Sequence, residues 1–109
     1  MTLDEYQKLS QRTLTIDPDR HDRLMATCAL GLAGESGEVV EHVKKFFGHG
    51  HDLERLKVRK ELGDVLWYVS ALATLCGLTL EDIAQGNIEK LRARYPEGFD
   101  PKRSQERAE

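Results

Sequence analysis

The sequence predicts an all-α protein, a helical bundle built on two long antiparallel helices and completed by association of identical chains. Apolar residues recur at helical spacing over residues 22–47 and again over residues 53–76. A glycine-rich segment separates these stretches, and no segment alternates convincingly between apolar and polar residues as a half-buried strand does. These observations predict helices joined by a bend, without a sheet.

The first predicted elements are a short helix and a loop. Thr2 stands at a suitable N-cap position with Glu5 three residues later, the pattern of a capping box. Pro18 then disfavours helix at the residue before it, so a loop precedes the first long helix over residues 22–47. No proline interrupts that long helix.

The predicted bend lies at Gly48 to Asp52, because glycine adopts positive φ easily and Asp52 is a suitable N-cap for the next helix. The second long helix spans residues 53–76 and ends at Gly77. A third major helix is expected over about residues 80–94, with Thr79 as its N-cap. It ends where the sequence reaches Tyr95 and a proline.

The length of 109 residues fits one hydrophobic core. We expect one helical domain over residues 1–99 and a polar tail over residues 100–109. The stretch over residues 62–72 is apolar on more than one helix face, which predicts a homodimer or homotetramer. Cys28 and Cys76 are expected to be buried free thiols.

Charge and hydropathy exclude two classes of partner. The formal net charge of -3 provides no positive field for duplex nucleic acid. The most apolar run, residues 62–76, is shorter than a bilayer span and is interrupted by Asp64. The first residues lack the basic and apolar regions of a signal peptide, so we expect a cytoplasmic protein without a membrane partner.

Two pairs of acids stand at matched heights on the long helices. Glu35 and Glu38 form one pair and Glu61 and Asp64 the other, each with the spacing that puts two carboxylates on one helix face. In an antiparallel hairpin, residues at equal height have numbers that add to one constant. Glu35 with Asp64 and Glu38 with Glu61 both meet the constant set by the predicted bend. The four acids are therefore expected to face one another.

Clustered carboxylates repel one another, and partial burial adds a desolvation cost, so the cluster needs protons, bases or metal ions to compensate. Hard oxygen ligands favour Mg²⁺, with Mn²⁺ as the other suitable ion. A di-iron site is disfavoured because the Glu-x-x-His motif of such sites is missing. The competing interpretation is that the acids lie on solvated faces and pair with lysine or arginine.

Three segments carry a resemblance to a known family. Residues 31–41 contain the first acid pair, residues 60–68 contain the second, and residues 87–99 follow as Asn-Ile-Glu-Lys-Leu and an Arg-Tyr-Pro-Glu-Gly-Phe ending. Together they resemble the MazG-like nucleoside triphosphate pyrophosphohydrolases, an all-α superfamily with Glu-x-x-Glu followed by Glu-x-x-Asp. The resemblance covers residues 24–99.

The resemblance implies Mg²⁺-dependent cleavage of a nucleoside triphosphate to the monophosphate and pyrophosphate, with a role in cleaning the nucleotide pool. Its motif implies four metal ligands: Glu35, Glu38, Glu61 and Asp64. A metal ion lowers the pKa of a bound water and neutralises phosphate charge. Which carboxylate is the general base stays open, and we favour Glu38.

The resemblance also implies substrate contacts. Asn87 and Lys90 match its Asn-x-x-Lys-Leu segment and are expected to contact phosphate or sugar, with Arg94 and Tyr95 nearby. Lys44 is expected to steer the triphosphate. For Lys44, Lys90 and Arg94 the alternative role is to complement the negative end of a helix dipole.

Two other functions remain open at this point. Phosphoribosyl-ATP pyrophosphohydrolase has related acid motifs and a similar length. A non-catalytic helical module that binds a nucleotide or a protein would use the acids only structurally. Rates on phosphoribosyl-ATP and a panel of dNTPs separate the first alternative, and the effect of Mg²⁺ on thermal stability separates the second.

Overall fold

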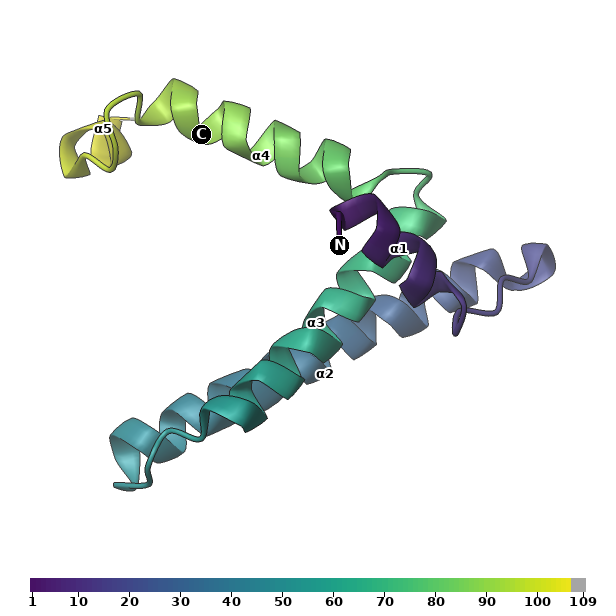
Figure 1. The fold of residues 1–109 in the computed structure, drawn as a ribbon, viewed down its shortest axis with the longest axis horizontal. Coiled ribbons are helices and arrows are strands. Elements are labelled where there is room, and N and C mark those ends of the chain that lie inside the picture. The colour runs from purple at the N-terminus through teal and green to yellow at the C-terminus, as the bar shows by residue number, and fades with distance from the viewer. Residues whose placement is uncertain (107–109) are drawn as a thin grey trace.

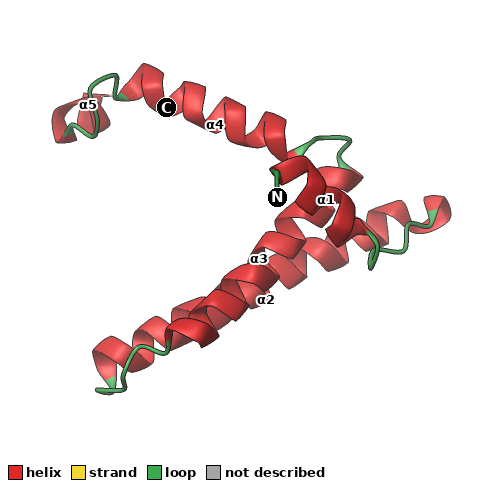
Figure 2. Cartoon of the chain, in the orientation of Figure 1, coloured by secondary structure: helices red, strands yellow, loops and turns green. Residues whose placement is uncertain are grey.

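A computed structural model describes residues 1–106, and within them the chain forms helices joined by loops (Figure 1, Figure 2). The helices are α1 (Leu3–Gln11), the 3-10 helix η1 (Pro18–Arg20), α2 (His21–Gly48), α3 (Arg55–Leu75), α4 (Leu80–Arg94) and α5 (Pro101–Glu106). The predicted all-helical class is confirmed. The last three positions of the predicted polar tail, 107–109, lie outside the described residues.

Helices α2 and α3 pack along each other, with α3 returning beside α2 after the loop of residues 49–54 (Figure 1). Gly50 has a φ of 70°, which a residue with a Cβ rarely adopts. The backbone N–H groups of His49 and His51 both donate to the carbonyl of Lys45, at 3.2 and 3.1 Å. The chain before α3 therefore first closes the end of α2.

This closure changes where α3 begins. The predicted N-cap, Asp52, is wrong, because Glu54 occupies the cap position and makes no side-chain capping hydrogen bond. The α3 backbone instead begins with the N–H groups of Lys57 and Val58, which donate to the Glu54 carbonyl. The loop is correspondingly longer than the predicted bend.

The core lies where α1, α2 and α3 meet. Cys28 of α2 packs with Ala71 and Leu75 of α3 in a fully buried cluster. Partly buried side chains surround it: Leu14, Leu24, Met25, Trp67, Tyr68 and Leu72. Cys76 is exposed rather than buried, because it is the C-cap residue beyond the last turn of α3. The prediction of two buried thiols is therefore wrong for Cys76.

Helix α1 is attached to the rest of the chain by side-chain hydrogen bonds. Its predicted capping box is present, with Thr2 and Glu5 bonding reciprocally. Gln7 is only 6% exposed, and its amide bonds Thr74 Oγ1, the Leu78 carbonyl and the Leu80 N–H. These contacts tie α1 to the end of α3 and the start of α4.

Helix α4 leads away from the α2–α3 hairpin (Figure 1) and packs against α1. Gly77 turns the chain with a φ of 70°, and Thr79 caps α4 by accepting a hydrogen bond from the Asp82 N–H, as expected. Among the described residues, no single helix is long and apolar enough to cross a membrane. Helices α3 and α4 meet that criterion only as a pair, by length and composition, across a bend of 102°.

Candidate functional site

Three of the four predicted acids converge between α2 and α3. One carboxylate oxygen from each of Glu35, Glu61 and Asp64 lies within 4.8 Å of the other two. All three side chains are half-buried. Glu35 comes from α2 and the other two come one turn apart from α3, so the packing of the two helices creates the cluster.

The cluster perturbs its own ionisation. The pKa of Glu35 is raised above its ordinary value of 4.5 by burial, then by the negative charge of Asp64, by a side-chain hydrogen bond with Glu61, and by the charges of Glu61 and Glu38. A hydrogen bond between two carboxyl groups requires a shared proton. A cation bound among these carboxylates would therefore offset both the burial and the repulsion.

Glu38 lies outside this group and is exposed. Residues three positions apart on an α-helix point about 60° apart around its axis, and α2 packs so that Glu35 rather than Glu38 faces the acids of α3. Glu35 therefore turns toward α3 while Glu38 turns toward solvent. The two remain close enough for the charge of Glu38 to raise the pKa of Glu35.

Two residues beside the cluster were missed by the sequence reasoning. His42 of α2 places its Nε2 atom 3.9 Å from Glu61 Oε1. Seven residues separate it from Glu35, a spacing that returns to nearly the same face of a helix. Tyr6 of α1 has a pKa raised by burial and, secondarily, by the charge of Asp64. The heptad spacing could have revealed His42, but no sequence signal pointed to Tyr6.

The predicted substrate residues of α4 do not join the acids within one chain. Asn87 and Lys90 are exposed, and Arg94 and Tyr95 are half-buried. The Tyr95 ring lies 5.3 Å from the Phe99 ring, centroid to centroid, and the Arg94 carbonyl accepts a hydrogen bond from Arg103 of α5. These residues belong to the arm formed by α4 and α5.

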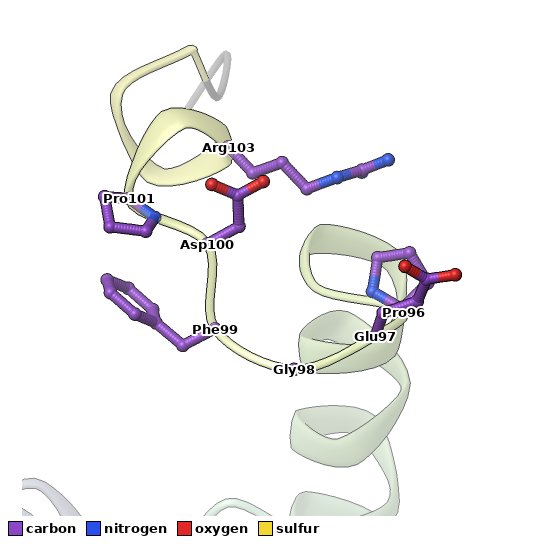
Figure 3. A pocket seen from close by; sticks show the side chains of 7 residues that line it. All are labelled: Pro96, Glu97, Gly98, Phe99, Asp100, Pro101 and Arg103. Carbon is purple, nitrogen blue, oxygen red and sulfur yellow. The ribbon is translucent and has the colours of Figure 1, made fainter.

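The end of this arm contains a pocket of about 430 Å³ (Figure 3). Its walls are the loop that follows α4 and the first residues of α5, namely Pro96, Glu97, Gly98, Phe99, Asp100, Pro101 and Arg103. Two acids and one arginine give it no strong preference for an anion. Lys44 lies elsewhere, on α2, where it is exposed and forms an ion pair with Glu41 at 3.9 Å.

A family model described as the MazG nucleotide pyrophosphohydrolase domain matches residues 24–99. The chain is also similar to the Gene 37 protein of Mycobacterium phage L5, with 37% identity over 73 residues. That similarity covers 63% of this chain and 64% of the phage protein, so the chain spans slightly less than two thirds of that relative. No solved structure matches. The matched segment contains all four acids and leaves out α1.

Proposed function

The chain belongs to the MazG nucleotide pyrophosphohydrolase family, and on this premise we propose that it cleaves a nucleoside triphosphate to the monophosphate and pyrophosphate with Mg²⁺. The observation that carries the proposal is the convergence of Glu35, Glu61 and Asp64 from two helices. Nucleotide-pool cleaning is the role this reaction would serve.

The donor set suits a hard divalent cation. Three carboxylates supply oxygen ligands and negative charge, which Mg²⁺ prefers, and Mn²⁺ is accepted by similar sites. A bound cation would also offset the burial and the mutual repulsion that together raise the pKa of Glu35. Glu35, Glu61 and Asp64 would hold the metal directly, and Glu38 would complete the ligand set.

The residues divide the chemistry between them. When bound, Mg²⁺ neutralises phosphate charge and lowers the pKa of water. Glu38 is exposed beside the cluster, so a water molecule can reach it, and it accepts the proton of the water that attacks phosphorus. The bond between the α and β phosphates breaks, and pyrophosphate leaves.

A second copy of the chain would complete the substrate site. Asn87 and Lys90 are exposed on α4, which packs against α1 and leads away from the hairpin (Figure 1). The hairpin meanwhile exposes large apolar side chains: Leu30, Val40, Leu62 and Leu66. In a homodimer, α4 of one copy would cover the hairpin of the other and bring its amide and ammonium groups to the phosphates.

A pyrophosphate-release assay tests the reaction. The substrates are the canonical and damaged NTPs, the dNTPs and phosphoribosyl-ATP, each with Mg²⁺ or with EDTA. We expect release that requires Mg²⁺ and falls at least 100-fold in Asp64→Asn and Glu38→Gln. The exposed acid Glu81 at the start of α4 gives a matched control, and Glu81→Gln should retain full activity.

The assay also separates the alternatives. Full activity of Asp64→Asn would contradict the proposed metal site. Pyrophosphate release from phosphoribosyl-ATP and from no other compound would identify the protein as a phosphoribosyl-ATP pyrophosphohydrolase. The proposed metal site would be unaffected by that result. A protein that releases no pyrophosphate and gains no thermal stability from Mg²⁺ would be a non-catalytic helical module.

A further inference from the structure

His42 lies beside Glu61, one of the three acids of the cluster. Its Nε2 atom is 3.9 Å from Glu61 Oε1, and the two side chains are only 22% and 17% exposed. Both helices of the hairpin contribute, since His42 comes from α2 and Glu61 from α3. The pair is therefore screened from water more than an ordinary surface ion pair is.

Glu61 has neighbours on two sides. It forms a side-chain hydrogen bond with Glu35, and its charge raises the pKa of Glu35. It approaches His42 through Oε1. A glutamate side chain has several rotatable bonds, so its carboxylate keeps one orientation only where its neighbours hold it. The residue that fixes this orientation influences how well the cluster binds a cation.

The geometry favours an indirect role for His42. The three acids form a group in which all chosen oxygen atoms lie within 4.8 Å of one another, and His42 is outside it. A direct ligand should approach all the other donors around one ion. An imidazole N–H directed at a ligand carboxylate is instead the arrangement that orients such ligands in metal sites.

We propose that His42 is a positioning residue that holds the Glu61 carboxylate in its metal-binding orientation through a hydrogen bond from Nε2. The inference rests on the proposed function, because it assumes that the acid cluster binds a divalent cation. A small rotation of either side chain would bring the separation of 3.9 Å to hydrogen-bond distance.

The test is Mn²⁺ binding to the full-length protein, measured by calorimetry and by electron paramagnetic resonance. His42→Ala removes the donor, and His42→Gln keeps an N–H group near the position of Nε2. His49→Ala is the matched control because His49 is exposed in the loop after α2. Far-ultraviolet circular dichroism in EDTA checks that each variant keeps its helices.

We expect His42→Ala to weaken Mn²⁺ binding by about 10- to 100-fold, the usual effect of removing a group that orients a metal ligand. His42→Gln should restore most of the affinity, and His49→Ala should match the wild type. In the pyrophosphate-release assay, His42→Ala should need more Mg²⁺ for half-maximal rate and keep most of its rate at saturating Mg²⁺.

Three results would overturn the inference. Wild-type Mn²⁺ affinity in His42→Ala, in an enzyme that still releases pyrophosphate, would remove the positioning role and leave the proposed function intact. A His42→Gln variant as weak as His42→Ala would point to the imidazole as a direct ligand. A wild-type protein that binds no Mn²⁺ and releases no pyrophosphate would refute the proposed function and the positioning role together.

Discussion

Glu35 is the member of the acid cluster whose pKa is raised. Burial raises its pKa first, and the carboxylates of Asp64 and Glu61 raise it further. The folded protein therefore holds this proton more tightly than the unfolded chain does. The tighter proton binding adds to the free energy of unfolding. This contribution is fully present below pH 4.5, the ordinary pKa of a glutamate, and it is lost as the pH rises through the raised pKa of the folded protein.

The first prediction follows from that pH dependence. In EDTA, Glu35→Gln should gain stability relative to the wild type as pH rises from about 4.5 to neutrality, because the variant has no proton to lose. In Mg²⁺ the order should reverse near neutral pH, since the ionised carboxylate then binds the cation. Thermal unfolding across this pH range measures both effects, and a pH-independent difference between the two proteins would contradict the argument.

Gly31 shows how closely α2 and α3 approach each other. A Cβ atom added there would overlap Cε1 and Cζ of Tyr68. No such contact exists at Gly34, one turn along α2, where nothing lies within 4 Å. The absence of a side chain at Gly31 thus makes room for the Tyr68 ring against the core.

The second prediction compares these two glycines. Gly31→Ala should cost about 1–3 kcal/mol of unfolding free energy, because the Tyr68 ring must move out of its packed position. Gly34→Ala should be neutral or stabilising by up to about 1 kcal/mol, because alanine is the better helix former. Urea unfolding of both variants measures the difference. Equal stabilities would show that the ring moves without cost.

The sequence predicted which acids come together more accurately than it predicted which way each side chain points. The spacing of Glu35, Glu61 and Asp64 identified three side chains that do converge. It also placed Glu38 opposite Glu61, whereas the structure leaves Glu38 exposed and places His42 beside Glu61. Height along a helix follows from residue numbers, but the rotation of each helix about its axis depends on packing that a single sequence does not specify.

Among the elements, α1 is fixed by unusually polar contacts. Ser10 Oγ lies 2.6 Å from Ser70 Oγ, and Trp67 Nε1 donates to the Ser10 carbonyl and to Thr13 Oγ1. Gln7 adds three hydrogen bonds to α3 and to the turn before α4. The helix therefore depends on matched donors and acceptors more than on a large apolar face.

The third prediction tests this attachment. Gln7→Leu should destabilise the protein by about 1–3 kcal/mol, because the buried Leu80 N–H loses its acceptor. The exposed neighbour Lys8 provides the control, and Lys8→Ala should change stability by less than about 0.5 kcal/mol. Chemical denaturation measures both. A Gln7→Leu variant as stable as the wild type would mean that apolar packing compensates for the lost hydrogen bonds.

Helix ends were predictable where a side chain makes the cap. Thr2 and Thr79 both cap the helices that the sequence assigned to them, and α4 has the predicted limits. The prediction of Asp52 as the N-cap of α3 was wrong. The Lys45 carbonyl accepts hydrogen bonds from the His49 and His51 N–H groups, so the loop continues beyond Asp52 before α3 begins. The sequence did not predict helix α5, because its polar residues form no apolar stripe. In the structure, the Arg103 side chain donates a hydrogen bond to the Arg94 carbonyl at the end of α4.

On the scale of the whole molecule, the buried core is small for the amount of apolar surface. Its fully buried cluster consists of Cys28, Ala71 and Leu75, whereas Leu30 is 75% exposed and Phe47 80%. Large exposed apolar side chains that lie together are typical of surfaces that pack against another chain. This supports the homo-oligomer that the sequence predicted.

The fourth prediction concerns that association. Leu30→Glu should raise the dissociation constant of the proposed homo-oligomer at least 10-fold, because it places a charge on an apolar face of the hairpin. Lys8→Glu, also on an exposed position but on α1, should leave the association unchanged. Sedimentation velocity over a range of concentrations measures the effect. A wild-type chain that remains monomeric would contradict the proposed arrangement of α4 over a second hairpin.

The path of α4 could not be predicted from the sequence. Its apolar residues, including Ile88 and Leu91, indicated a helix that packs, but they did not identify what it packs against. The bend of 102° after α3 follows from the turn at Gly77 and the hydrogen bonds of Gln7. These are long-range contacts, and periodicity within one helix holds no information about them.

The different environments of the two thiols give this protein a built-in attachment point for spectroscopic probes. Cys28 is buried, which raises its pKa and keeps it unreactive, while Cys76 is exposed at the turn from α3 to α4. A maleimide dye or nitroxide should therefore label Cys76 alone in the folded protein. The distance from such a probe to a cation in the acid cluster would report, without any engineered substitution, whether the junction shifts when nucleotide enters.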